Sequence, residues 1–236
     1  MRRARAPLPG PFLVITDRHL ARQPLETIAA AVGRGGGRWL LFRDKDLAAP
    51  ARRDLAIRLA RIAAEHGVAF SVSADIEVAA AVGATGVHLQ AASAVAPARE
   101  RLPDAIFGVS AHSLADVAAA AAAGADYVTL SPIFVTESKP GYGPPLGTDA
   151  LRAAAAHGIP VLALAGVTSA TAGACLAAGA RGVAVMGEVM RADDPAGIVR
   201  DLVKACEEVA AREGATTREG PAENKETGGA TPGSSV

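Results

Sequence analysis

The sequence predicts an α/β protein built as a single (β/α)8 barrel (TIM barrel), and two observations carry this prediction. First, one junction recurs three times, as AVGATGVHL (81–89), AAGADYVTL (122–130) and AAGARGVAV (177–185). Each time an Ala-rich helix ends on a glycine, which takes the left-handed conformation of a helix C-terminus, and a short apolar strand follows. Second, apolar runs and helical patterns alternate strictly along the chain, which is typical of a parallel sheet.

Eight apolar runs are the candidate strands of this sheet. They lie at 12–16, 38–42, 68–72, 86–89, 106–110, 127–131, 160–166 and 182–186. The helical patterns lie near 24–33, 51–66, 75–82, 95–101, 113–123, 148–157, 168–178 and 195–212. Most of the runs lack polar alternation, which indicates strands buried on both faces. Eight such units favour closure into a barrel over an open doubly wound sheet.

The chain of 236 residues has the length of one barrel domain. We assign residues 12–213 to the barrel and residues 1–11, which begin MRRARAPLPG, to a short basic leader. From Gly214 the sequence turns polar and rich in Gly, Pro, Thr and Glu, so we expect 214–236 to be a disordered tail.

The amino-acid composition indicates which binding partners and which cell compartment to expect. A formal net charge of +0 gives no electrostatic reason for binding nucleic acid or an anionic membrane. No apolar run approaches the roughly 20 residues of a membrane span, and the run after the basic start is too short for a secretory signal. Both cysteines, Cys175 and Cys206, fall in predicted helices, so we expect no disulfide and a cytoplasmic protein. The sequence leaves the oligomeric state open, including a homo-oligomer.

The C-terminal ends of barrel strands carry the active site in this fold, so the residues there are the candidates. The last two strands end in Gly166 and in Met186-Gly187. Small residues at these two ends expose backbone N–H groups that bind phosphate, although tight turns without a ligand would look the same. The long segment 131–147 adds Thr136, Ser138 and Lys139, two hydroxyls and a cation for an anionic group, and its length predicts a lid.

Other polar residues follow the earlier strands. Arg43 and Lys45 alternate on one segment, so both can face the mouth, and Ser110 ends the strand at 106–110. His112 lies just past that strand, where an imidazole can act as general base and acid, or can simply be a capping or surface residue. His88 falls inside the strand at 86–89, and we expect it to point inward and support the site.

Seven ordered segments resemble the thiamine phosphate synthase and TenI superfamily over about residues 12–205. They are ITD, RDKDL, GVHLQ, GVSAHS, GADYVTLSPIFVTESKPG, ALAGV and GVAVM. Synthases of this superfamily join a pyrimidine methyl pyrophosphate to a thiazole phosphate with Mg²⁺. In the TenI branch, a tautomerase aromatises a carboxythiazole phosphate without a metal, and a histidine in the place of His112 shuttles the proton.

This chain departs from the synthase pattern at the metal site. Leu41 stands where synthases usually have Gln, although Arg43 and Lys45 match. The two carboxylates that bind Mg²⁺ in synthases are replaced by Ala74 and Ser93. Because Mg²⁺ needs hard oxygen ligands to neutralise a departing pyrophosphate, this loss argues against the synthase reaction.

The resemblance therefore implies a TenI-like thiazole tautomerase that needs no cofactor; Mg²⁺ enters only if the chain is a synthase. His112 would move the proton and a phosphorylated thiazole would be the partner. The phosphate would be held by Thr136, Ser138, Gly166, Met186 and Gly187, and the rest of the substrate by Arg43, Lys45, Ser110 and Lys139. Two alternatives stay open: a thiamine phosphate synthase with an altered metal site, and a catalytically silent ligand-binding or regulatory barrel.

Overall fold

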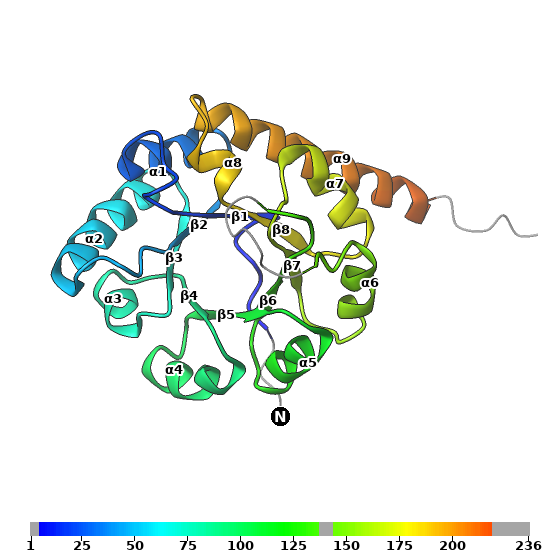
Figure 1. Ribbon diagram of the computed structural model, residues 1–236, viewed down its shortest axis with the longest axis horizontal. Helices are drawn as coiled ribbons and strands as arrows, with labels where there is room; N and C mark the ends of the chain where they lie inside the picture. The colour runs from blue at the N-terminus through cyan, green and yellow to red at the C-terminus, as the bar shows by residue number, and fades with distance from the viewer. Residues whose placement is uncertain (1–4, 137–143, 219–236) are drawn as a thin grey trace, which may run out of the picture.

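Eight parallel strands form a closed barrel in the computed structural model, which describes residues 5–136 and 144–218. Each strand pairs with the next along the chain, and β8 pairs with β1 to close the ring seen in Figure 1. The strands are β1 Phe12–Ile15, β2 Trp39–Phe42, β3 Ala69–Ser73, β4 Gly86–Leu89, β5 Ile106–Ala111, β6 Tyr127–Leu130, β7 Val161–Ala163 and β8 Gly182–Val185. The predicted barrel is confirmed, and the open sheet is excluded.

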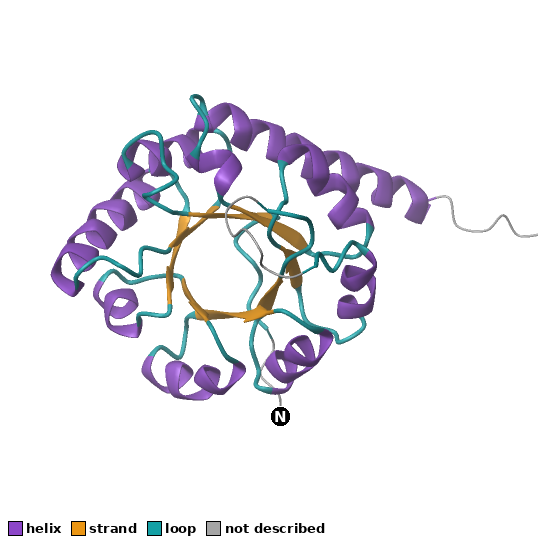
Figure 2. Ribbon diagram, viewed as in Figure 1, coloured by secondary structure: helices purple, strands orange, loops and turns teal. Residues whose placement is uncertain are grey.

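Helices surround the ring of strands on the outside (Figure 2). They are α1 Leu25–Arg34, α2 Ala49–Glu65, α3 Ile76–Ala81, α4 Val95–Arg101, α5 Leu114–Ala122, α6 Asp149–Ala155, α7 Ser169–Ala177, α8 Gly187–Met190 and α9 Pro195–Arg218, with a 3-10 turn η1 at Ala92–Ala94. Every predicted helix is present, whereas α8 and η1 were not predicted. At the three repeated junctions the glycines have φ of 59°, 80° and 94°, so each ends its helix in the left-handed conformation as expected.

The last helix, α9, continues to Arg218 and so passes Gly214, where the change in composition predicted the tail to begin. Residues 219–236, the rest of that predicted tail, lie outside the described part of the chain. Cys175 on α7 and Cys206 on α9 are both buried and both free thiols. Within the described ranges, no helix is long and apolar enough to cross a membrane.

The strands are buried on both faces, as their apolar runs predicted. Side chains that point outward pack against the helices, and side chains that point inward form a second cluster inside the ring. That inner cluster consists of Leu13, Ile15, Trp39, Leu41, Ile106, Tyr127, Leu162 and Ala184. The rings of Trp39 and Tyr127 meet edge to face, with centroids 4.9 Å apart. The barrel interior is therefore a packed core and not a pore.

The start of the chain packs against the N-terminal end of the barrel. Arg5 Nε donates to the carbonyl oxygen of Ala125 over 3.1 Å, and Ala6 and Leu8 contact the inner cluster. In Figure 1 this segment (blue) crosses the ring of strands. The described part of the segment that we assigned to a leader thus lies against the barrel.

Candidate active site

A cavity of about 660 Å³ lies at the C-terminal ends of the strands, within the size range of small-molecule sites. All eight strands or the loops that follow them contribute to its lining. The structure brings eight of the ten predicted site residues to this one cavity: Arg43, Lys45, Ser110, His112, Thr136, Gly166, Met186 and Gly187. The other two, Ser138 and Lys139, lie outside the described residues.

The loop after β7 forms one wall of the cavity in a conformation that requires glycine. Ala165 and Gly166 both have positive φ, of 72° and 65°. A Cβ on Gly166 would lie 2.6 Å from Cβ of Phe134 and would collide with the carbonyl oxygen of Val135. The backbone N–H groups of Gly166 and of Gly187, after β8, have no acceptor within the described part of the chain. Two backbone donors without an acceptor among the described residues therefore belong to residues at the ends of β7 and β8, where this fold commonly binds phosphate.

Two charged residues that we did not predict border this end of the cavity: Glu188 lies in α8, and Arg191 directly follows it. The guanidinium of Arg191 lies against Gly187, since a Cβ there would meet Nη2 at 2.5 Å. The carboxylate of Glu188 accepts hydrogen bonds from the backbone N–H and the hydroxyl of Ser169 at the start of α7, both over 2.8 Å. Glu188 is thus held by α7, while Arg191 adds a positive charge near the exposed N–H groups.

Two further cations, Arg43 and Lys45, line the wall of the cavity beyond β2. The residue between them, Asp44, turns the other way and is buried, where Thr16 Oγ1 donates to its carboxylate over 3.2 Å. Burial raises the pKa of Asp44, and hydrogen bonds from Thr16 and Arg18 oppose that rise. The alternation read from the sequence therefore places both cations at the mouth.

His112 follows β5 and is oriented by the backbone after β6. Its Nδ1 lies 3.0 Å from the carbonyl oxygen of Ser131, which can only accept, so Nδ1 carries the hydrogen. In the neutral ring Nε2 is then the basic nitrogen. The backbone N–H of His112 donates to Asp116, which lowers the pKa of that carboxyl group. The residue that caps α5 is Ser113, whose hydroxyl accepts from the backbone N–H of Asp116.

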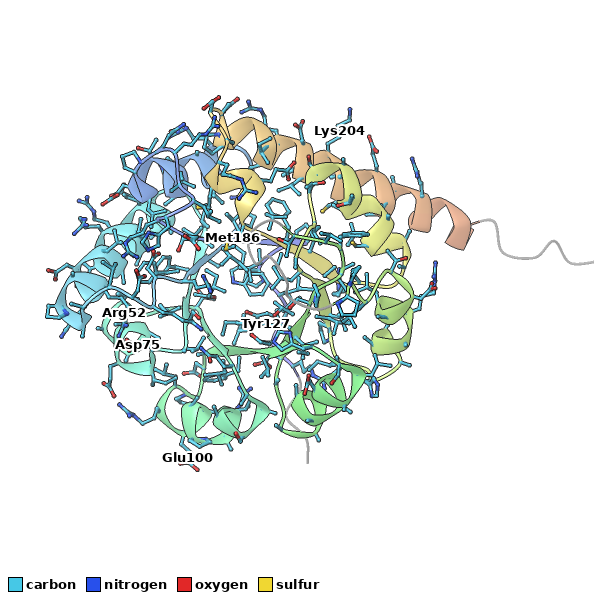
Figure 3. The ribbon with its side chains drawn as sticks, in the orientation of Figure 1. Arg52, Asp75, Glu100, Tyr127, Met186 and Lys204 are labelled. Atoms are coloured by element: carbon cyan, nitrogen blue, oxygen red, sulfur yellow. The ribbon has the colours of Figure 1, made fainter. Side chains whose placement is uncertain are left out.

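His88 points into the barrel, as its place in the strand predicted, and lines the inner end of the cavity. It is buried, its Nδ1 lies 3.1 Å from Tyr127 Oη, and its Nε2 lies 3.1 Å from Ser110 Oγ. Burial, with a smaller contribution from the charge of Lys45, lowers the pKa of His88 to about 4. Gly108 makes room for this arrangement, because a Cβ there would lie 2.5 Å from His88 Nδ1. Figure 3 shows Tyr127 inside the ring of strands.

The residues present do not fit the magnesium site of a synthase. Ala74 and Ser93 offer no carboxylate, and Ala74 has a φ of 63° that an alanine seldom adopts. The adjacent Asp75 is already engaged, because it caps α3 and accepts from Arg52 Nη2 over 2.5 Å. Arg52 and Asp75 lie outside the ring of strands in Figure 3. Within the described ranges, no group of three or more metal-ligating side chains is found.

The closed barrel and the cavity at the C-terminal ends of its strands define the class: a (β/α)8 barrel with its site at the usual end of the fold. The model of the thiamine monophosphate synthase family matches residues 12–189, and the chain belongs to that family. It is therefore a member of an enzyme family of thiamine biosynthesis.

Relatives and a solved structure agree with this assignment. A putative thiamine-phosphate synthase of Geobacter sulfurreducens is 39% identical over 195 residues, which cover 80% of this chain and 91% of that protein. A bifunctional thiamine biosynthesis protein, ThiM/ThiE of Symbiobacterium thermophilum, is 39% identical over 75% of this chain, which spans only 37% of that protein. The thiamine phosphate pyrophosphorylase of Pyrococcus furiosus superposes with a TM-score of 0.75 at 30% identity, covering 84% of this chain and 96% of its own.

Proposed function

We propose that the cavity binds a thiazole phosphate with its phosphate between the ends of β7 and β8. The support is the pair of backbone donors, Gly166 and Gly187, together with the side chain of Thr136 and the charge of Arg191 in the same wall. Met186 shapes this wall, Ser138 belongs to the same proposed phosphate set on the strength of the sequence, and Lys139 would contact the rest of the substrate. Oxyanions are stabilised by several preorganised N–H donors supplemented by a cation.

For the reaction we propose tautomerisation of a carboxythiazole phosphate, in which His112 carries the proton. Aromatisation removes a proton from a ring carbon and delivers one to the exocyclic carbon. A neutral imidazole can accept the first and return the second, which a carboxylate or a lysine does poorly near pH 7. The observation that carries this proposal is the bond from Nδ1 of His112, a residue that lines the cavity, to the Ser131 carbonyl, which makes Nε2 the basic nitrogen of the neutral ring. Arg43 and Lys45 would bind the substrate carboxylate.

The second candidate is thiamine phosphate synthase, and the comparisons favour it. The family model and the relatives bear the name of the synthase, and none of the relatives described above is called a tautomerase. In that reaction Arg43 and Lys45 would face the pyrophosphate. The residues at the expected metal site argue against the synthase reaction, because positions 74 and 93 offer no carboxylate for Mg²⁺.

Two assays on one preparation of the full chain separate these candidates. We expect metal-free turnover of carboxythiazole phosphate, and no Mg²⁺-dependent release of pyrophosphate from pyrimidine pyrophosphate and thiazole phosphate. Pyrophosphate release without tautomerase turnover would establish the synthase instead. Binding of thiazole phosphate with neither turnover would identify a silent ligand-binding barrel.

A further inference from the structure

Four polar side chains form a connected group inside the barrel, at the inner end of the cavity. His88 is its centre, with Tyr127 on Nδ1 at 3.1 Å and with Ser110 and Thr129 on Nε2 at 3.1 and 3.3 Å. Burying such groups costs free energy unless each of them finds a hydrogen-bond partner. Of the four, both Ser110 and His88 line the cavity, whereas Tyr127 lies within the inner apolar cluster.

The direction of each hydrogen bond follows from the chemistry of Tyr127. Burial raises the pKa of its phenol, so the group keeps its hydrogen and must donate it. Within the described part of the chain, the hydrogen-bond partner of Tyr127 Oη is His88 Nδ1. A buried O–H group that makes no hydrogen bond costs free energy, so the Tyr127 hydroxyl donates to Nδ1 of His88. The hydrogen of the neutral imidazole therefore lies on Nε2.

That assignment also determines what Ser110 does. Since Nε2 of His88 carries a hydrogen, the Ser110 hydroxyl accepts from it and cannot donate to it. The hydroxyl hydrogen of Ser110 then turns away from His88 and toward the cavity that Ser110 lines. Burial and the nearby charge of Lys45 keep His88 neutral, with a pKa of about 4, so this direction holds at physiological pH.

We propose that Tyr127 and His88 are positioning residues that set the Ser110 hydroxyl as a hydrogen-bond donor into the cavity, toward an acceptor atom of the bound ligand. The proposal rests on the proposed function in one respect, that a thiazole phosphate occupies this cavity. The proposal also predicts which ligands the cavity prefers. A ligand with a nitrogen or oxygen acceptor opposite Ser110 is bound. A ligand with an N–H group at that point is disfavoured, because two hydrogen-bond donors would face each other.

The tautomer of His88 can be tested on the wild-type protein without any ligand. Nitrogen-15 NMR of labelled histidine distinguishes a protonated ring nitrogen from an unprotonated one. We expect Nδ1 of His88 to be unprotonated and Nε2 to be protonated at pH 7. The opposite pattern would overturn the proposal, whatever reaction the protein catalyses.

The role of the group in binding can be tested with Ser110→Ala, Tyr127→Phe and the double variant, titrated with thiazole phosphate. Each single variant should weaken binding about two- to tenfold, the range expected for one hydrogen bond. Because Tyr127 acts through Ser110, the double variant should bind no more weakly than Ser110→Ala alone. Additive losses, or unchanged affinity in Tyr127→Phe, would contradict the proposal.

Two controls separate positioning from general damage to the core. Ser71→Ala removes another buried hydroxyl, which accepts from Trp39 Nε1 over 2.9 Å and does not line the cavity, and it should leave the affinity unchanged. Inorganic phosphate, which would reach only the ends of β7 and β8, should bind all the variants equally. Failure of the wild type to bind thiazole phosphate would remove the proposed function, while the NMR result would still decide the direction of the hydrogen bonds.

Discussion

The carbonyl oxygen of Ser131, just after β6, accepts a hydrogen bond from Nδ1 of His112, just after β5, over 3.0 Å. Two adjacent strands of the barrel thereby fix both the orientation and the tautomer of one imidazole. The hydroxyl of the same Ser131 lies 3.3 Å from Nδ1, so backbone and side chain of one residue together hold the ring. This geometry suits a residue that must accept and return the same proton.

His112→Asn tests that role. The variant should turn over carboxythiazole phosphate about 10²- to 10⁴-fold more slowly, the usual cost of losing a positioned general base, with phosphate affinity near wild type. Steady-state kinetics and phosphate titration measure the two effects separately. His157→Asn, at an exposed position after α6, is the matched control. A full rate in His112→Asn would remove the residue from the mechanism, and equal losses of rate and binding would mark it as structural.

The phosphate site is tested at Gly166. Gly166→Asp should abolish binding of phosphate or sulfate, because it places a carboxylate and a colliding Cβ in the loop after β7. Gly158→Ala is the control, since Gly158 has nearly the same φ, 64°, but nothing within 4 Å of its Cβ position. It should cost about 1 kcal/mol of stability and leave phosphate affinity intact. Equal phosphate affinity in wild type and Gly166→Asp would show that the site is assigned wrongly.

Magnesium should change neither ligand affinity nor turnover appreciably, because Ala74 and Ser93 replace the carboxylates that synthases use. Calorimetry and turnover with and without Mg²⁺, each against an EDTA-treated sample, provide the measurement. A strict Mg²⁺ requirement for coupling the pyrimidine pyrophosphate to thiazole phosphate would overturn the tautomerase proposal. The variant with Ala74→Asp and Ser93→Asp then shows whether the two carboxylates suffice to restore a metal site.

The lowered pKa of His88 predicts how the stability of the protein depends on pH. Its pKa is about 4 in the folded protein against 6.5 for the free side chain, so between these values the unfolded chain binds a proton that the folded chain does not. The free energy of unfolding should therefore fall as the pH drops from about 6.5 to about 4, by up to roughly 3 kcal/mol. Denaturant unfolding of His88→Gln should show a correspondingly flatter profile. An unchanged profile in that variant would contradict the shifted pKa.

The fold could be predicted from the sequence because the patterns that indicate it are local in the chain. Apolar runs buried on both faces and the glycine at each repeated junction located the strands to within about three residues. The largest error is the run 160–166, of which only Val161–Ala163 is strand β7, because the chain leaves the sheet for the positive-φ turn at Ala165 and Gly166. Helix α8 was missed because four residues are too few to show a helical period.

The residues of the candidate site could be predicted from the sequence only in part, for a related reason. Residues at strand ends were located because parallel strands of a barrel all end at one mouth. Arg191 and Glu188 were missed because the unpredicted α8 brings them there. The pairing of His88 with Tyr127 joins β4 to β6, and no local pattern in either strand reports which side chains meet inside the ring.

The filled interior of the barrel has a kinetic consequence. Because the inner cluster fills the core below the cavity and Ala6 and Leu8 pack against it from the other end, the barrel offers no through-channel in the part that the structure describes. A ligand must leave by the same C-terminal mouth through which it entered. If the product of the proposed tautomerisation keeps its phosphate at Gly166 and Gly187, it blocks the next substrate, and we expect inhibition by product to be competitive.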